Sequence, residues 1–160
     1  MGEYENIKPL IKILKNINPI INITFFSPSG YNHFKDFDLI QQVNYLPIDL
    51  KEKMHSFIEI INPMMVIISK NDIWPNMVTL IKNKNIPLYS IGLKLNENKI
   101  NNWVIKKYYL NYLSKFSHIF CQDERTSNFL KNHKIAKYSI IKETRVNQIL
   151  DDLSVNYKNE

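Results

Sequence analysis

The sequence predicts a doubly wound α/β fold, in which helices cover both faces of a parallel β-sheet. Short continuous apolar segments with strand character alternate with amphipathic helical segments, which is the pattern of such a sheet. The chain has 160 residues, 44% of them hydrophobic, which is enough for one domain with its own core. We therefore assign residues 1–150 to one domain and the polar residues 151–160 to a tail or a truncated interdomain linker.

The first elements are a helix and a strand. Apolar residues recur at three- and four-residue steps, which predicts a helix at about 5–16, and Pro19 ends it. Residues 20–26 are β-branched and aromatic, which is typical of a strand, and the Ser-Pro-Ser-Gly sequence at 27–30 indicates a turn. A second strand is predicted at 42–46.

The rest of the chain repeats the alternation of helix and strand, and Asp49 is placed to cap the next helix. The predicted helices are 49–61, 75–84, 101–115 and 123–132. The predicted strands are 64–69, 88–92, 118–122 and 138–142. Ligands bind beyond the carboxyl ends of the strands in such sheets, so we expect the loops at 27–30, 69–74 and 122–123 to lie at one edge.

Composition excludes several kinds of site. The 21 Lys and Arg residues outnumber the 15 Asp and Glu residues but are scattered, which permits a phosphate-bearing or membrane-surface partner and gives no basic stripe for nucleic acid. Cys121 is single and the four histidines have no ligand-like spacing, so we predict no disulfide, metal or cofactor. No segment approaches the ~20 uncharged apolar residues of a membrane span.

Four strips of sequence stand out by their order and spacing. They are 2–5 (GEYE), 24–31 (TFFSPSGY), 45–49 (YLPID) and 72–76 (DIWPN). Together they resemble the N-terminal domain of 3-deoxy-D-manno-octulosonic acid (Kdo) transferases, in a Bacteroidetes-like version. Weaker similarity follows at 86–89, 121–124 and 144–146.

The resemblance implies a GT-B glycosyltransferase, with one Rossmann-like domain for the acceptor and another for the nucleotide sugar. It implies transfer of Kdo from CMP-Kdo to a lipid A precursor by a peripheral enzyme at the cytoplasmic face of the inner membrane. It covers the acceptor-side domain only, and the CMP-Kdo domain would lie beyond Glu160. We therefore do not expect the 160-residue chain to be active by itself.

Two carboxylates match catalytic positions of the family. Glu3 matches the base that takes the proton from the acceptor hydroxyl, and the alternative is that Glu3 only caps a helix. Asp72 matches a second acidic position, usually Glu, and is one methylene shorter. Its alternative role is to cap the helix that begins near Pro75.

The expected acceptor-binding residues lie in two loops. Ser27, Ser29 and Gly30 form a small polar turn whose N–H groups suit a phosphate or sugar oxygen, although an ordinary turn would look the same. Trp74 either stacks on a sugar or fills the core, and the core is favoured.

Two helices carry residues that suit either solvent, core or a membrane surface. Lys8, Lys12 and Lys15 on the opening helix either face solvent or contact anionic lipid headgroups. The predicted helix at 101–115 is rich in aromatic residues. Its rings either pack in the core or contact a membrane interface, and the core is favoured for at least half of them. These rings are Trp103, Tyr108, Tyr109, Tyr112 and Phe116.

The sequence departs from the family before residue 2. The family has a β-strand there, and usually a membrane anchor before it. That strand is central in the sheet, so without it each buried unpaired backbone group costs about 1–3 kcal/mol, and we expect marginal stability. The alternative function is a non-catalytic remnant or binding module with the same fold. A stand-alone regulatory or nucleic-acid-associated α/β domain is less favoured, because the sequence has no phospho-acceptor Asp cluster.

Overall fold

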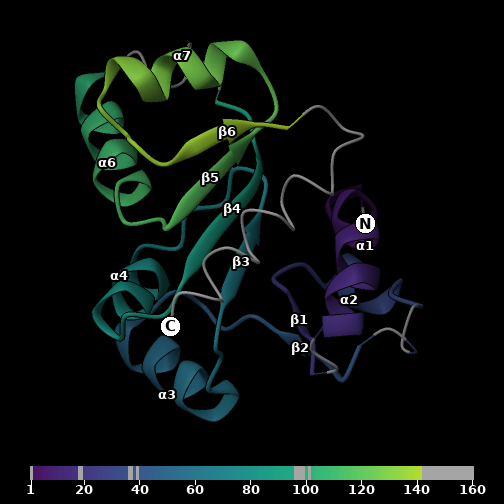
Figure 1. Ribbon diagram of the computed structural model, residues 1–160. Coiled ribbons are helices and arrows are strands. Elements are labelled where there is room, and N and C mark those ends of the chain that lie inside the picture. Colours follow the sequence, from purple (N-terminus) through teal and green to yellow (C-terminus); the bar gives the residue numbers. More distant parts are fainter. Residues whose placement is uncertain are drawn as a thin grey trace. The chain divides into compact units, whose positions relative to one another are not determined.

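The computed structural model describes residues 2–17, 20–35, 38, 40–95, 100 and 102–141. Parallel strands alternate with helices in this part of the chain, which confirms the α/β class (Figure 1). The chain divides into two compact units, and the boundary falls between Ile48 and Asp49. The predicted helix stop at Pro19, the strip at 144–146 and the tail at 151–160 lie outside the described residues.

The first unit contains a two-stranded parallel sheet. Its elements are α1 (Gly2–Ile17), β1 (Asn22–Phe25), α2 (Pro28–Asn32) and β2 (Gln42–Tyr45). The two strands pair in register from Asn22↔Gln42 to Phe25↔Tyr45. The opening helix and both strands are confirmed. The turn predicted at 27–30 is wrong, because the short helix α2 begins at Pro28, whose fixed φ suits the first helical position.

Aromatic rings hold α1 against the sheet of this unit. Tyr4 and Ile11 from α1 are buried in one cluster with Ile23 and Phe34. The ring of Tyr4 lies 4.9 Å from that of Phe34 and 6.5 Å from that of Phe25, centroid to centroid, in edge-to-face arrangements. Because side chains alternate along a strand, Ile23 and Phe25 share the face that α1 covers.

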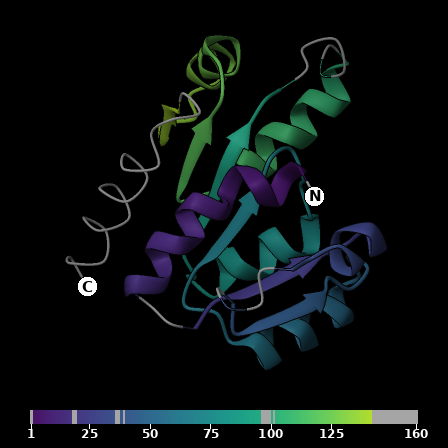
Figure 2. The same cartoon turned by 90° about the vertical axis from the view of Figure 1, so that its right-hand side faces the viewer.

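The second unit contains a four-stranded parallel sheet in the order β3-β4-β5-β6. Its strands are β3 (Val66–Ser69), β4 (Leu88–Leu93), β5 (His118–Cys121) and β6 (Tyr138–Ile140). Its helices are α3 (Lys51–Ile61), α4 (Pro75–Asn83), α6 (Trp103–Leu113) and α7 (Glu124–Asn132). These are the predicted elements with small shifts at their ends, and Figure 2 shows β3, β4 and β5 running in one direction.

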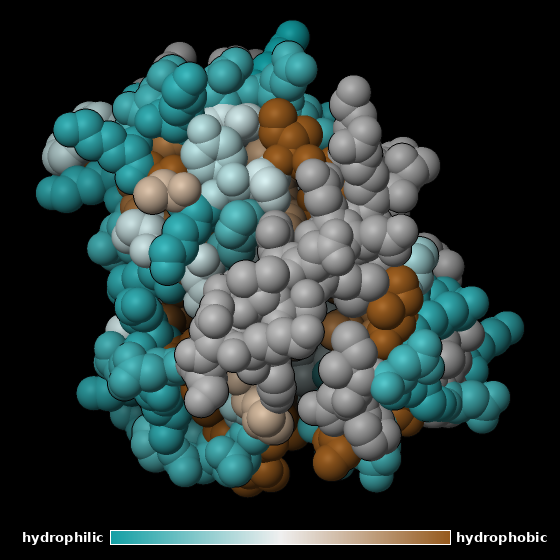
Figure 3. All heavy atoms as spheres, viewed as in Figure 1, coloured by the Kyte–Doolittle hydropathy of each residue, from teal (hydrophilic) through white to brown (hydrophobic). Residues whose placement is uncertain are grey.

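The connections place the crossover helices on one face of this sheet. Each of α4, α6 and α7 links neighbouring parallel strands, and right-handed crossovers that advance in one direction keep their helices on the same side (Figure 1). The outer surface of α7 is hydrophilic (Figure 3). The fully buried side chains of this unit include Val78, Ile81, Ile119, Phe120 and Leu130.

In each sheet, the first strand along the chain lies at an edge. Among the described strands, β1 pairs only with β2, and β3 pairs only with β4. Both strands have four residues.

Candidate functional site

The hydroxyl groups of Ser27 and Ser29 lie side by side at the carboxyl end of β1. Their Oγ atoms are 2.7 Å apart, and both residues are exposed. Ser27 occupies the N-cap position of α2 without a side-chain capping bond, while its carbonyl accepts from the N–H groups of Gly30 and Tyr31 at 3.1 and 3.3 Å. The loop therefore presents two adjacent hydroxyls outward at the end of a strand.

Gly30 is buried beneath this loop and has a packing role. A Cβ atom at residue 30 would lie 2.6 Å from Cδ1 of Phe25, a distance that real Cβ atoms essentially never show. The absence of a side chain lets α2 lie directly on the Phe25 ring. The sequence singled out Gly30 for its N–H group, and the structure adds this close approach.

The sequence did not single out Tyr31, in α2, and Tyr45, at the carboxyl end of β2, whose rings contact each other. The rings of Tyr31 and Tyr45 are stacked, with centroids 4.2 Å apart and planes at 21°. Both are exposed, and so is Phe26, which directly follows β1. Aromatic faces bind the apolar faces of sugar rings, and hydroxyls bind their edges. This contact could not be predicted from the sequence, because Tyr31 and Tyr45 come together only when β1 pairs with β2, with Phe25 opposite Tyr45.

Glu3 lies in the first turn of α1, and its side chain is outside the described residues. The next residue, Tyr4, is buried in the aromatic cluster of the first unit. This contact anchors the backbone next to Glu3.

Asp72 and Trp74 lie in the loop between β3 and α4. Asp72 is exposed, and Trp74 is half-buried at the N-cap position of α4, without a side-chain capping bond. The N-cap residue of α4 is thus Trp74 and not Asp72, whose capping was one of the two roles that the sequence allowed. The exposure of Trp74 is intermediate, between the core and the stacking roles that the sequence allowed.

Asp49 supplies the cap of α4 instead. Its Oδ2 accepts from the N–H of Asn76 at 3.0 Å, and its Oδ1 accepts from the N–H of Met77 at 3.1 Å. Pro75 has no N–H, so these are the first donors of α4 that need acceptors. The predicted capping of the 49–61 helix by Asp49 is wrong, because the N-cap of α3 is Leu50, without a side-chain cap, and α3 packs against α4.

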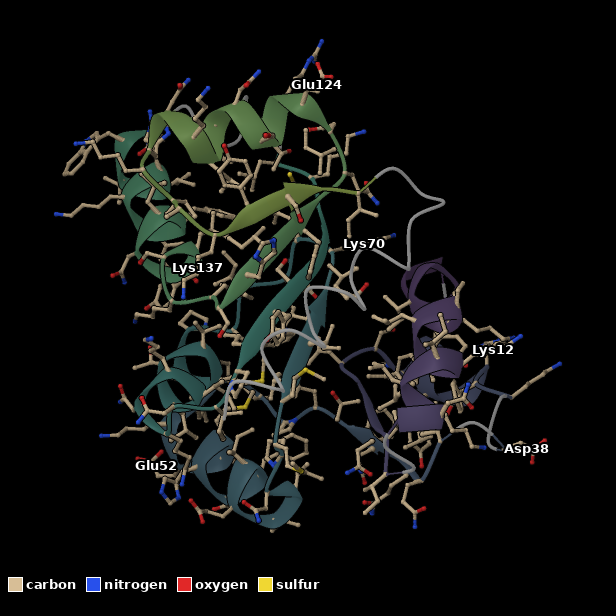
Figure 4. All side chains as sticks on the ribbon, in the orientation of Figure 1. Lys12, Asp38, Glu52, Lys70, Glu124 and Lys137 are labelled. Carbon is tan, nitrogen blue, oxygen red and sulfur yellow. The ribbon has the colours of Figure 1, made fainter. Side chains whose placement is uncertain are left out.

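Three loops meet at the carboxyl edge of the four-stranded sheet. Oδ1 of Asn71 accepts from the N–H of Lys94 at 2.8 Å, and Oγ1 of Thr126 accepts from the N–H of Leu95 at 3.0 Å. The loops at 69–74 and 122–123 thus share one edge, as predicted, while the loop at 27–30 belongs to the other unit. Figure 4 shows Lys70 and Glu124 at this edge.

Asp123 and Gly92 shape the same edge. Oδ1 of Asp123 accepts from the N–H of Thr126 at 2.8 Å and caps α7, and this bond holds the pKa of the Asp123 carboxyl below its usual value. Gly92 has φ +76° at an irregularity in the pairing of β4 with β5. Only glycine adopts that conformation without strain.

A family model described as 3-deoxy-D-manno-octulosonic-acid transferase (kdotransferase) matches residues 1–148. The chain belongs to the Kdo transferase family. A 3-deoxy-D-manno-octulosonic acid transferase of Haemophilus influenzae is 30% identical over 127 residues, which cover 77% of this chain. The match covers 30% of that relative, so this chain spans less than half of the length of the Kdo transferase it resembles.

Cys121 and His118, two side chains of this Kdo transferase chain with reactive groups, form hydrogen bonds within the second unit. Burial raises the pKa of the Cys121 thiol to about 11, and its Sγ donates to the carbonyl of Ser139 at 3.3 Å. His118 bonds the hydroxyl of Ser139 at 3.0 Å. Within the described ranges no group of three or more His, Cys, Asp or Glu residues is arranged to hold a metal ion. No helix in the described ranges is long and apolar enough to cross a bilayer.

Replacing Asp49 with Ala should lower the free energy of unfolding of the second unit by about 1–2 kcal/mol, because two N–H groups of α4 lose their acceptors. The measurement is chemical denaturation followed by thiol labelling of buried Cys121. Asp49→Asn, which keeps one acceptor oxygen, should lose less. Equal stability of Asp49→Ala and the parent would contradict the capping role.

Proposed function

We propose that this chain is the acceptor-side part of a Kdo transferase that passes Kdo from CMP-Kdo to a lipid A precursor at the inner membrane. The family match over residues 1–148 carries this proposal. In this proposal the donor is bound outside the residues 1–148 that the family model matches. The chain therefore supplies one of two halves of the reaction site.

Hydroxyls and aromatic rings in the first unit support an acceptor-binding role. The paired hydroxyls of Ser27 and Ser29 bond sugar or phosphate oxygens, and Gly30 lets the loop approach closely. The stacked rings of Tyr31 and Tyr45 add an exposed aromatic surface that suits a glucosamine ring. Together these groups match the chemistry of a phosphorylated sugar lipid.

Glu3 acts as the general base in this proposal. Its carboxylate takes the proton of the acceptor hydroxyl, the hydroxyl oxygen bonds to the anomeric carbon of Kdo, and the bond from that carbon to CMP breaks. Asp72 binds an acceptor hydroxyl, and the half-buried Trp74 in the same loop contacts the sugar. CMP leaves with the electrons of the broken bond.

A chimera tests the function directly. Residues 1–148 replace the matching segment of the Haemophilus influenzae relative, and membranes that contain the chimera are supplied with labelled CMP-Kdo and lipid A precursor. We expect labelled Kdo in the lipid product, and none from the 160-residue chain alone. A folded chimera that binds the precursor but transfers nothing would favour a non-catalytic binding module.

A further inference from the structure

The first two turns of α6 expose four large apolar side chains. Trp103 is 72% exposed, Val104 54%, Ile105 41% and Tyr108 42%. These four residues are the α6 patch. Single exposed apolar residues are common on protein surfaces, whereas four large ones within two turns of one helix form a candidate contact surface.

The patch is not needed to hold α6 on its own unit. The helix is anchored by its other end, where Leu113 and the following Phe116 are buried. Nζ of Lys115 donates to the hydroxyl of Thr79 on α4 at 3.1 Å. Of the five rings predicted on this helix, Phe116 is buried, Tyr109 and Tyr112 are half-buried, and Trp103 and Tyr108 are exposed. The core role thus holds for the second half of α6 only.

The charged residues of α6 itself have one sign; outside this helix, the carboxylate of Asp49 acts on Tyr108. Lys106 and Lys107 lie between its members, and α6 contains no Asp or Glu. Lys107 is exposed, and Nζ of Lys106 lies 5.8 Å from the centroid of the Phe129 ring. Trp and Tyr favour the boundary between lipid tails and headgroups, and lysines are drawn to anionic headgroups. The combination matches an interfacial helix.

Charge also argues against a second copy of this chain as the occupant. In a two-fold symmetric contact the same patch meets itself, so Lys106 and Lys107 of both copies would approach each other. An anionic lipid surface instead neutralises both lysines while it buries the apolar side chains. The lysines of α1 make a weaker case, because Lys15 donates to the carbonyl of Asp38. Lys12 of α1 extends into solvent, and the described side chains of α1 include no large exposed apolar residue (Figure 4).

The α6 patch lies near the carboxyl edge of the four-stranded sheet. A helix that follows a strand in a parallel α/β unit starts near the carboxyl edge of the sheet, and the patch occupies that start of α6 (Figure 1). The loop with Asp72 and Trp74 leaves β3 at the same edge. A membrane that contacts the patch would therefore hold its lipids near that loop.

We propose that the α6 patch docks this unit on an anionic phospholipid surface, with Trp103 and Tyr108 at the headgroup level and Lys106 and Lys107 against the phosphates. Its role in presenting a lipid acceptor rests on the proposed function. The docking itself depends only on the exposed side chains and their charge.

The test uses the 160-residue chain and sedimentation with vesicles of phosphatidylcholine, with or without phosphatidylglycerol. The parent chain should bind the phosphatidylglycerol vesicles, and added salt should weaken binding. Trp103→Ser with Ile105→Ser should weaken binding about tenfold or more, because two large apolar side chains leave the interface. Lys106→Gln and Lys107→Gln should each weaken it about fivefold. Circular dichroism should show all variants folded.

Ile60→Ser on α3 is the matched control, because Ile60 is 81% exposed and lies outside the patch. It should bind like the parent. Equal binding by the Trp103→Ser, Ile105→Ser variant would overturn the proposal, and so would binding that ignores phosphatidylglycerol. A dimer in sedimentation velocity that this variant abolishes would assign the patch to a second copy instead.

The same variant separates docking from the reaction. In the chimera it should lower Kdo transfer to precursor embedded in vesicles and leave transfer to detergent-dispersed precursor unchanged. If the chimera transfers nothing in either form while the chain still binds vesicles through the patch, the proposed function fails and the docking stands. Equal loss in vesicles and in detergent would overturn the docking role in catalysis.

Discussion

Replacing Glu3 with Gln in the chimera should lower the rate of Kdo transfer by about 10²- to 10⁴-fold, the usual contribution of a positioned general base. Gln has nearly the same shape as Glu and cannot take a proton from the acceptor hydroxyl. Residue 3 lies in the first turn of α1, next to the buried ring of Tyr4, so we expect the substitution to leave the backbone unchanged. Binding of the precursor should therefore persist while the chemical step slows.

Initial rates with labelled CMP-Kdo measure the effect, and Glu5→Gln is the matched control. Glu5 lies in the same turn and loses the same charge, and residues two apart in a helix are ~200° apart around its axis. Glu5→Gln should keep most of the activity. Transfer by Glu3→Gln at the parent rate would show that Glu3 is not the base. Equal losses of activity in both variants would indicate a general charge effect.

The largest effect on stability is expected for Phe120→Ala, at about 3–5 kcal/mol. Phe120 is 0% exposed on β5, between β4 and β6, and its ring packs against that of His118 with centroids 4.5 Å apart. Truncation leaves a cavity where two layers of the unit meet. Since whole domains are stable by about 5–15 kcal/mol, this loss is a large share of the free energy of unfolding.

Cys121 reports on this unfolding because it follows Phe120 in the same strand and its side chain is fully buried. Thiol labelling at increasing urea concentration should shift to lower denaturant in Phe120→Ala, with faster labelling in water. Ile60→Ala, at an exposed apolar residue, should stay within about 0.5 kcal/mol of the parent. A loss below about 1 kcal/mol in Phe120→Ala would show that the core of the second unit is loosely packed.

The alternation of strands and helices was predictable because it depends on neighbouring residues. A continuous apolar run such as Val66–Ser69 and the three- to four-residue apolar period of α3 are both visible within a short window. The short helix α2 was missed because Ser, Pro and Gly favour turns, and its five residues are too few to show a period. Its Pro28 fits a first helical turn equally well.

The sequence by itself determined the α/β class, the order of the elements, the Kdo transferase family and the candidate base Glu3, because periodicity and motif strips are local. Only the tertiary structure decided that Asp49 caps α4, 27 residues further along the chain. It also decided that Tyr31 stacks on Tyr45 and that Trp103 stays exposed at the start of an otherwise anchored helix. Such contacts depend on which strands pair and which helix faces are left over, and no local pattern of residues encodes that choice.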